Sequence, residues 1–188
     1  PTLRPARAGG AEFRFTPPQG TPQTRENLGG MEVTTYTLHP DTSAADLRFL
    51  KQAVDEGRKC TPSATSYCVG AVVVTADGRI FAGHTHETSP THHAEQEAIA
   101  KALAAGAALR GAAMYSSMEP CSQRASEPES CTQLLLKYGF AHAVFALYEP
   151  GCFVCCRGAL TLREEGVDVR VYPGLAGGVW EANAHLKR

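Results

Sequence analysis

One stretch of the chain sets the strongest limit on its fold. Residues 68–74 have the sequence Cys-Val-Gly-Ala-Val-Val-Val, which is rich in the β-branched residues that favour strands, and Asp77-Gly78 follows before a second apolar stretch at 79–83. An Asp-Gly pair between two strand-forming stretches is a strong signal for a tight hairpin turn. The sequence therefore predicts a β-hairpin here.

Helical and extended patterns alternate on both sides of this hairpin. Strong helix formers fill 94–105, and Gly106 stands where such a helix would end. Asp41 and Thr42 can cap an earlier helix that ends near Cys60. Further strands are predicted at 112–117, 141–147 and 167–172, and further helices at 132–138 and 157–165. This order predicts a three-layer α/β domain with several parallel strands.

Length and composition fit one catalytic domain with a shorter segment on each side. A chain of 188 residues with 43% hydrophobic content can bury a single core. We expect an irregular Pro- and Gly-rich arm at 1–40, a catalytic domain at 41–174 and a helical tail at 175–188. Seven cysteines, an odd number in a chain of this size, favour thiol or metal chemistry over disulfide staples.

Charge and apolar runs disfavour two classes of partner. The formal net charge of -1 shows no basic excess of the kind that drives binding to a phosphate backbone, so we expect no nucleic-acid partner. No apolar run approaches the roughly 20 residues that span a bilayer, and the N-terminus lacks the apolar core of a secretory signal. We therefore expect a cytoplasmic protein without a membrane partner.

The densest chemical signal is a set of residues that can bind a metal. Thr91-His-His-Ala-Glu95 leads into the second predicted helix, Met118-Glu-Pro-Cys121 follows a strand, and Cys131 comes soon after. A catalytic zinc ion takes three protein ligands and keeps a fourth position for water, whose pKa it lowers to about 7. His93, Cys121 and Cys131 meet that requirement, so we predict that they bind Zn²⁺. The segment with Cys152, Cys155 and Cys156 is a competing source of a ligand or of a structural zinc site, although packing also explains it.

Glu95 supplies the proton chemistry that such a site needs. Expelling ammonia from a ring requires a proton on the leaving amine and a proton on the ring nitrogen, and a carboxyl group can transfer both. Glu95 lies two residues from His93, close enough to act without binding the metal. His-x-Glu followed by Pro-Cys is the signature of zinc deaminases, so Glu95 is the predicted catalytic residue.

Two motifs, His93-Ala94-Glu95 and Glu119-Pro120-Cys121, are shared with the cytidine deaminase superfamily. The sequence resembles this superfamily over roughly residues 45–172. The resemblance implies a three-layer α/β/α cytidine deaminase-like fold with a central mixed five-stranded sheet. It also implies zinc-dependent hydrolytic deamination and a homodimer. In the superfamily two residues usually separate the cysteines, whereas nine residues, 122–130, separate them here.

That longer insertion is similar to the one in the deaminases of fungal riboflavin biosynthesis, and Glu149-Pro150 extends the similarity. The resemblance implies a phosphorylated pyrimidine substrate, 2,5-diamino-6-ribitylamino-4(3H)-pyrimidinone 5′-phosphate. Arg124 in the insertion is the best-placed cation for the phosphate, although a solvated surface cation is as common.

Three further residues are candidate substrate contacts. His84 and His86 follow the hairpin's second strand, where loop histidines that face solvent are also common. Ser66 belongs to the segment in which bacterial riboflavin deaminases carry a substrate-binding Asn, which is absent here.

Three alternative functions remain open at this point. A cytidine or deoxycytidylate deaminase would use the same chemistry with a different pocket. A tRNA adenosine deaminase would need a basic path for the strand, which the near-neutral charge disfavours. A non-catalytic zinc module built on Cys121, Cys131, Cys152 and Cys155 would leave His93 and Glu95 without a purpose.

Overall fold

Two sheets are present in the part of the chain that the computed structural model describes, which is residues 24–28, 31–35, 43–150 and 156–186. The smaller sheet is a hairpin of β1 (Thr24–Leu28) and β2 (Met31–Thr35), which pair antiparallel. It belongs to a unit separate from the one that holds the rest of the described chain. The remainder of the Pro- and Gly-rich arm at 1–40 lies outside the described residues.

The larger sheet has five strands in the order β4-β3-β5-β6-β7. These are β3 (Gly70–Val74), β4 (Ile80–His84), β5 (Ala113–Met118), β6 (His142–Leu147) and β7 (Asp168–Val171). β3 pairs antiparallel with both β4 and β5, whereas β5, β6 and β7 run parallel. Gly78 forms the hairpin turn with a φ of 83°, a backbone conformation that glycine adopts without steric cost. The predicted hairpin and the mixed five-stranded sheet are both confirmed.

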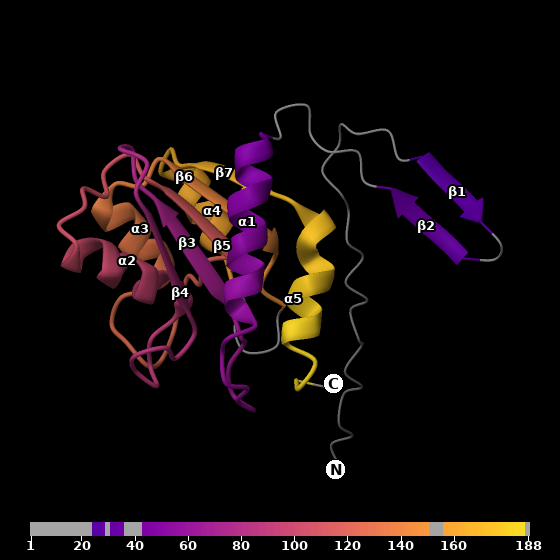
Figure 1. Ribbon diagram of the computed structural model, residues 1–188, viewed down its shortest axis with the longest axis horizontal. Coiled ribbons are helices and arrows are strands. Elements are labelled where there is room, and N and C mark those ends of the chain that lie inside the picture. The colour runs from indigo at the N-terminus through magenta and orange to yellow at the C-terminus, as the bar shows by residue number, and fades with distance from the viewer. Residues whose placement is uncertain (1–23, 29–30, 36–42, 151–155, 187–188) are drawn as a thin grey trace, which may run out of the picture. The chain divides into compact units, whose positions relative to one another are not determined.

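Helices cover both faces of this sheet, as Figure 1 shows. They are α1 (Ala44–Gly57), α2 (Ala94–Ala104), α3 (Cys131–Tyr138), α4 (Gly158–Glu164) and α5 (Ala176–Ala182). Neighbouring strand residues point to opposite faces. Val72, Tyr115 and Val144 therefore pack with α1 and α5, while Val73, Met114 and Ala143 pack with α2, α3 and α4. The predicted three-layer α/β/α arrangement is confirmed.

The start of α1 differs from the prediction. Asp41 and Thr42 lie outside the described residues, and the N-cap is Ser43, whose side chain accepts a hydrogen bond from the backbone N–H of Asp46 at 2.9 Å. Several capping residues stand next to one another here, so composition alone does not select among them. None of the described helices is both long and apolar enough to cross a membrane.

Two glycines bring the end of α1 unusually close to the start of β3. A Cβ atom on Gly70 would lie 2.1 Å from the carbonyl oxygen of Ala53 and 2.3 Å from the backbone nitrogen of Gly57. A Cβ atom on Gly57 would lie 2.9 Å from the nitrogen of Gly70. Any larger residue at position 70 would force the helix and the sheet apart.

Candidate metal centre

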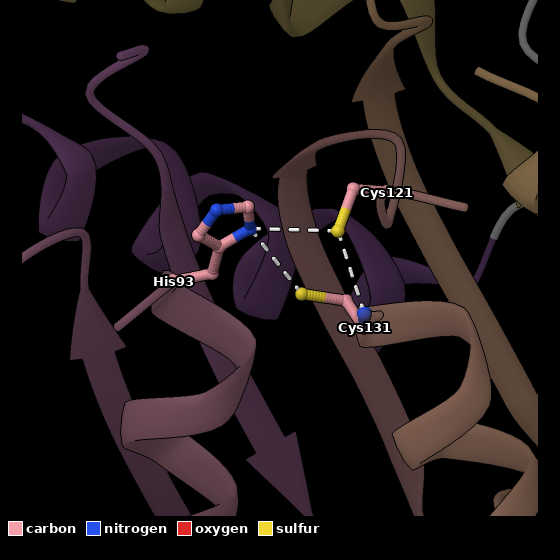
Figure 2. A group of neighbouring side chains, drawn as sticks. All are labelled: His93, Cys121 and Cys131. Atoms are coloured by element: carbon pink, nitrogen blue, oxygen red, sulfur yellow. Dashed lines mark hydrogen bonds between the residues drawn. The ribbon is translucent and has the colours of Figure 1, made fainter. Parts of the chain in front are cut away.

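Three ligand side chains meet at one end of the sheet, each supplied by a different element. His93 is the N-cap of α2, Cys131 is the first residue of α3, and Cys121 follows the end of β5. Figure 2 shows the imidazole and both sulfur atoms turned toward one another. The Nδ1 atom of His93 lies 3.5 Å from the Sγ atom of Cys121 and 3.5 Å from the Sγ atom of Cys131.

These distances fit a tetrahedral zinc site. Zinc binds sulfur at about 2.3 Å and imidazole nitrogen at about 2.0 to 2.1 Å, which sets a nitrogen and a sulfur about 3.6 Å apart across a tetrahedron. Both measured edges match that value. All three ligand atoms lie within 4.8 Å of one another. One imidazole and two thiolates form the donor set of a catalytic zinc site, which leaves a fourth position open.

Local structure fixes both sulfur ligands. The backbone N–H of Cys131 donates to the sulfur of Cys121 at 3.4 Å, and the N–H of Thr132 donates to the carbonyl oxygen of Cys121 at 3.1 Å. Ser130 and Gln133 form a capping box at the start of α3. The two ends of the 122–130 insertion are therefore held together. Hydrogen bonding with the thiol of Cys131, helped by the imidazole of His93, lowers the pKa of Cys121 to about 4, which favours the thiolate that a metal requires.

Glu95 is buried beside the three ligands, in the first turn of α2. Its Oε1 atom accepts a hydrogen bond from the hydroxyl of Ser116 at 3.1 Å, and its Oε2 atom lies 3.4 Å from the sulfur of Cys131. Burial raises the pKa of the Glu95 carboxyl. A carboxyl group with this placement can take up and return protons beside the metal position.

Glu119 has a structural role that the sequence did not indicate. Its buried carboxylate accepts hydrogen bonds from the backbone N–H of Ala159 at 2.8 Å and of Glu149 at 3.3 Å. Ala159 lies in the first turn of α4, and Glu149 follows β6. Glu119 thus ties three chain segments together next to Cys121.

A small pocket opens beside the ligands. It has a volume of about 50 Å³, and its lining includes Tyr67, Val69, Thr85 and Glu149 together with His93, Glu95 and Cys121. Burial raises the pKa of Glu149 to about 7. This volume is well below the roughly 300 Å³ of typical ligand pockets. The segment that starts at Ser66 does reach this pocket, but its neighbours Tyr67 and Val69 form the lining in place of Ser66. No local pattern in the sequence marks Thr85.

Arg124 lies in the insertion and faces a second cavity of about 340 Å³. One of its terminal nitrogens donates to the side chain of Gln96 at 2.8 Å. Its Nε and Nη1 atoms are buried and have no hydrogen-bond partner among the described residues. A guanidinium group with unused donors is suited to an anion.

The other candidate substrate residues lie outside the lining of the small pocket. The Nδ1 atom of His84 faces the carboxylates of Glu56 at 3.4 Å and Glu87 at 3.5 Å. His86 has a φ of 61°, and burial and the charge of His93 lower its pKa. Ser66 is half-buried next to Tyr67, and its hydroxyl has no partner among the described residues.

The competing cysteine segment is described only in part. Cys152 and Cys155 lie outside the described residues. The sulfur of Cys156 lies 3.6 Å from the carbonyl oxygen of Pro120, and burial raises the pKa of this thiol to about 12.

Known proteins resemble the part of the chain that holds the candidate metal centre. Residues 43–147 match the family model for the cytidine and deoxycytidylate deaminase zinc-binding region. A diaminohydroxyphosphoribosylamino-pyrimidine deaminase of Schizosaccharomyces pombe is 39% identical over 64% of this chain and 30% of its own length. A riboflavin biosynthesis protein RibD of Chlamydia pneumoniae is 33% identical over 78% of this chain and 37% of its own length. The chain therefore spans about a third of the length of these curated relatives.

Solved structures of deaminases also superpose on this chain. The Aspergillus oryzae Rib2 deaminase in complex with DARIPP superposes with a TM-score of 0.66 at 25% identity, over 77% of this chain and 93% of that one. The Thermotoga maritima diaminohydroxyphosphoribosylaminopyrimidine deaminase/reductase superposes with a TM-score of 0.66 at 28% identity, over 75% of this chain and 40% of that one. With its zinc-binding region matched over more than half of its length, the chain belongs to the cytidine and deoxycytidylate deaminase family.

Proposed function

We propose that this chain is a zinc-dependent hydrolytic deaminase that acts on the ribitylaminopyrimidine 5′-phosphate of riboflavin biosynthesis. The observation that carries the proposal is the placement of Glu95, buried and 3.4 Å from the sulfur of Cys131, beside three ligand atoms at zinc-site distances. A relative named as a riboflavin biosynthesis protein and a solved Rib2 deaminase in complex with DARIPP support the choice of substrate.

The reaction replaces an exocyclic amino group with oxygen, so water is consumed and ammonia leaves. His93, Cys121 and Cys131 would hold the zinc ion. When bound, this ion would lower the pKa of a water molecule and polarise the groups on the ring carbon that the water attacks. The Oε2 atom of Glu95 takes the proton from the attacking water and gives it to the ring nitrogen. The same carboxylate would then take the second proton from the hydroxyl newly added to the carbon and deliver it to the departing amine, which leaves as ammonia while the C=O bond forms. The hydroxyl of Ser116 holds Oε1, which keeps the carboxyl plane fixed during these transfers.

Arg124 supports a phosphorylated substrate. Its two unused buried donors can bind phosphate oxygens. Arg124 also lies close enough to the metal centre for its charge to act on Cys131. That charge lowers the pKa of Cys131, while the hydrogen bond with Cys121 and burial raise it by more. Ser66, His84 and His86 remain proposed substrate contacts. We also propose that the protein works as a cytoplasmic homodimer. We propose that it has no nucleic-acid partner, which is in keeping with its net charge of -1.

A substrate panel tests this function. Zinc-loaded protein is given the ribitylaminopyrimidine 5′-phosphate, its dephosphorylated form, deoxycytidylate or cytidine at equal concentration, and ammonia release is followed. We expect the highest kcat/KM for the first compound. Arg124→Ala should raise KM for the phosphorylated compound about tenfold or more, and should leave KM for the dephosphorylated one nearly unchanged.

Two results would contradict the proposal. A higher kcat/KM for deoxycytidylate or cytidine would overturn the substrate and leave the deaminase chemistry in place. An equal loss on both forms of the pyrimidine in Arg124→Ala would show that Arg124 does not bind the phosphate.

A further inference from the structure

A second pair of cysteines lies apart from the metal centre, at the junction of α1 and β3. The sulfur atoms of Cys60 and Cys68 are 2.7 Å apart, and both residues are buried. This separation is within about 0.7 Å of a covalent disulfide, whose sulfur atoms lie about 2.05 Å apart. We propose that Cys60 and Cys68 are an oxidisable dithiol that closes to a disulfide with little movement of the backbone.

The surrounding structure holds the pair in place. Cys60 comes three residues after Gly57, and Cys68 comes two residues before Gly70, so the close approach of these two glycines brings the thiols together. Asn183 of the C-terminal segment fixes the backbone of Cys68 from the other side. Its Oδ1 atom accepts from the N–H of Cys68 at 2.7 Å, and its Nδ2 atom donates to the carbonyl oxygen of Cys68 at 3.0 Å.

A shared metal ion does not explain this pair. Two thiolates on one zinc ion lie about 3.8 Å apart across a tetrahedron, which is much farther than the measured 2.7 Å. Within the described ranges of the chain, no third His, Cys, Asp or Glu completes a ligand group around Cys60 and Cys68. The geometry therefore favours a sulfur–sulfur bond over a metal site.

The oxidation balances with a low-molecular-weight disulfide such as oxidised glutathione. Burial raises the pKa of both thiols, and that of Cys68 reaches about 12, so Cys60 reacts first. Its thiolate attacks one sulfur of the oxidant, forms a mixed disulfide and releases one glutathione thiol. The sulfur of Cys68 then attacks the sulfur of Cys60 and releases the second. The protein loses two protons and two electrons, which the oxidant gains.

The Cys60–Cys68 disulfide would close residues 61–67 into a covalent loop next to the pocket. Tyr67 and Val69 flank Cys68, and both line the pocket beside the metal ligands. The disulfide would join the residues at the two ends of this segment and so fix one wall of the pocket. This inference does not depend on the proposed substrate, and its test measures sulfur pairing instead of turnover.

The experiment uses the zinc-loaded full chain, treated with millimolar oxidised glutathione, then alkylated and digested without reduction. We expect a peptide pair that links Cys60 to Cys68, unchanged zinc content, and a Tm about 5 °C higher than that of the reduced protein. Cys60→Ser and Cys68→Ser should each abolish both the linked peptides and the rise in Tm. Cys60→Ala repeats the test if the serine variant folds poorly.

Three outcomes would overturn the inference. One is a stable glutathione adduct on Cys60 that never resolves to the internal bond. The second is a Cys121–Cys131 link with zinc release while Cys60 and Cys68 remain open to alkylation after unfolding. The third is a rise in Tm of the same size in the Cys60→Ser variant.

Discussion

Two pairs of buried cysteines in this protein have the same side chains and different surroundings. Cys121 and Cys131 share their site with the imidazole of His93 and the carboxyl of Glu95. Cys60 and Cys68 are buried and contact each other and backbone carbonyl oxygens. In the first pair the pKa of Cys121 falls to about 4 while that of Cys131 rises, whereas in the second pair the pKa values of both thiols rise, that of Cys68 to about 12.

The contrast shows that neighbours, and not burial alone, decide what a thiol can do. A hydrogen-bond donor and a nearby imidazole stabilise the thiolate of Cys121, which suits it to bind a metal. At the other pair, burial without such partners keeps both thiols protonated. Proximity then leaves oxidation as the available chemistry.

The largest expected effect is on zinc content. His93→Ala, Cys121→Ala and Cys131→Ala should each lose the metal, because the site needs all three ligands. Cys60→Ala and Cys155→Ala should keep one zinc ion per chain. Elemental analysis of the purified variants measures this. Zinc loss in Cys60→Ala or Cys155→Ala, or full retention in Cys131→Ala, would contradict the assignment of the ligands.

The next largest expected effect is on kcat of the proposed deamination, without a change in zinc content. Glu95→Gln should keep zinc and fold but lose about 10²-fold to 10⁴-fold in kcat, because it removes a proton carrier and no ligand. Cys60→Ala serves as the matched control, since it alters a buried thiol outside the metal centre whose chain neighbours do not line the pocket, and it should stay near the parent rate. Turnover and zinc content are measured on the same samples. Near-normal turnover in Glu95→Gln would exclude the proposed proton transfers.

The smallest effect is on stability at the junction that holds the second pair. Gly70→Ala should cost about 3 kcal/mol, because its Cβ would lie 2.1 Å from the oxygen of Ala53. Thermal unfolding of the zinc-loaded protein measures the change as a lower Tm. Gly177→Ala is the control, since no neighbouring atom lies within 4 Å of its Cβ, and it should be neutral or stabilising by up to about 1 kcal/mol. Equal Tm values for the two variants would mean that the close approach is unimportant.

The sequence predicted what local patterns determine. β-branched runs, an Asp-Gly turn and helix formers ended by glycine placed all five strands of the main sheet, with boundaries shifted by one or two residues. His93, Glu95, Cys121 and Cys131 were chosen as candidates from the His-x-Glu and Pro-Cys motifs and from the ligands that zinc prefers, and the structure brings their side chains together at one edge of the sheet.

The sequence could not predict contacts between distant segments. Glu119 binds the backbone of Ala159, forty residues away, and nothing near either residue indicates that bond. The meeting of Cys60 and Cys68 depends on Gly57, Gly70 and Asn183, which belong to three separate elements or their ends. His84 is the last residue of β4 and does not follow the hairpin as expected, and the hairpin pattern does not set the direction of its ring, which faces Glu56.

The closure of the 122–130 insertion has a consequence for how such proteins change over time. The N–H groups of Cys131 and Thr132 bond to Cys121, so the anchor points of the insertion stay fixed whatever lies between them. Residues can be exchanged in the middle of the insertion, away from Ser130 and its capping box, without a displacement of either sulfur ligand. Selection for a new substrate can therefore act on this segment while the chemistry is preserved, and the same segment is the natural place to graft new specificity by design.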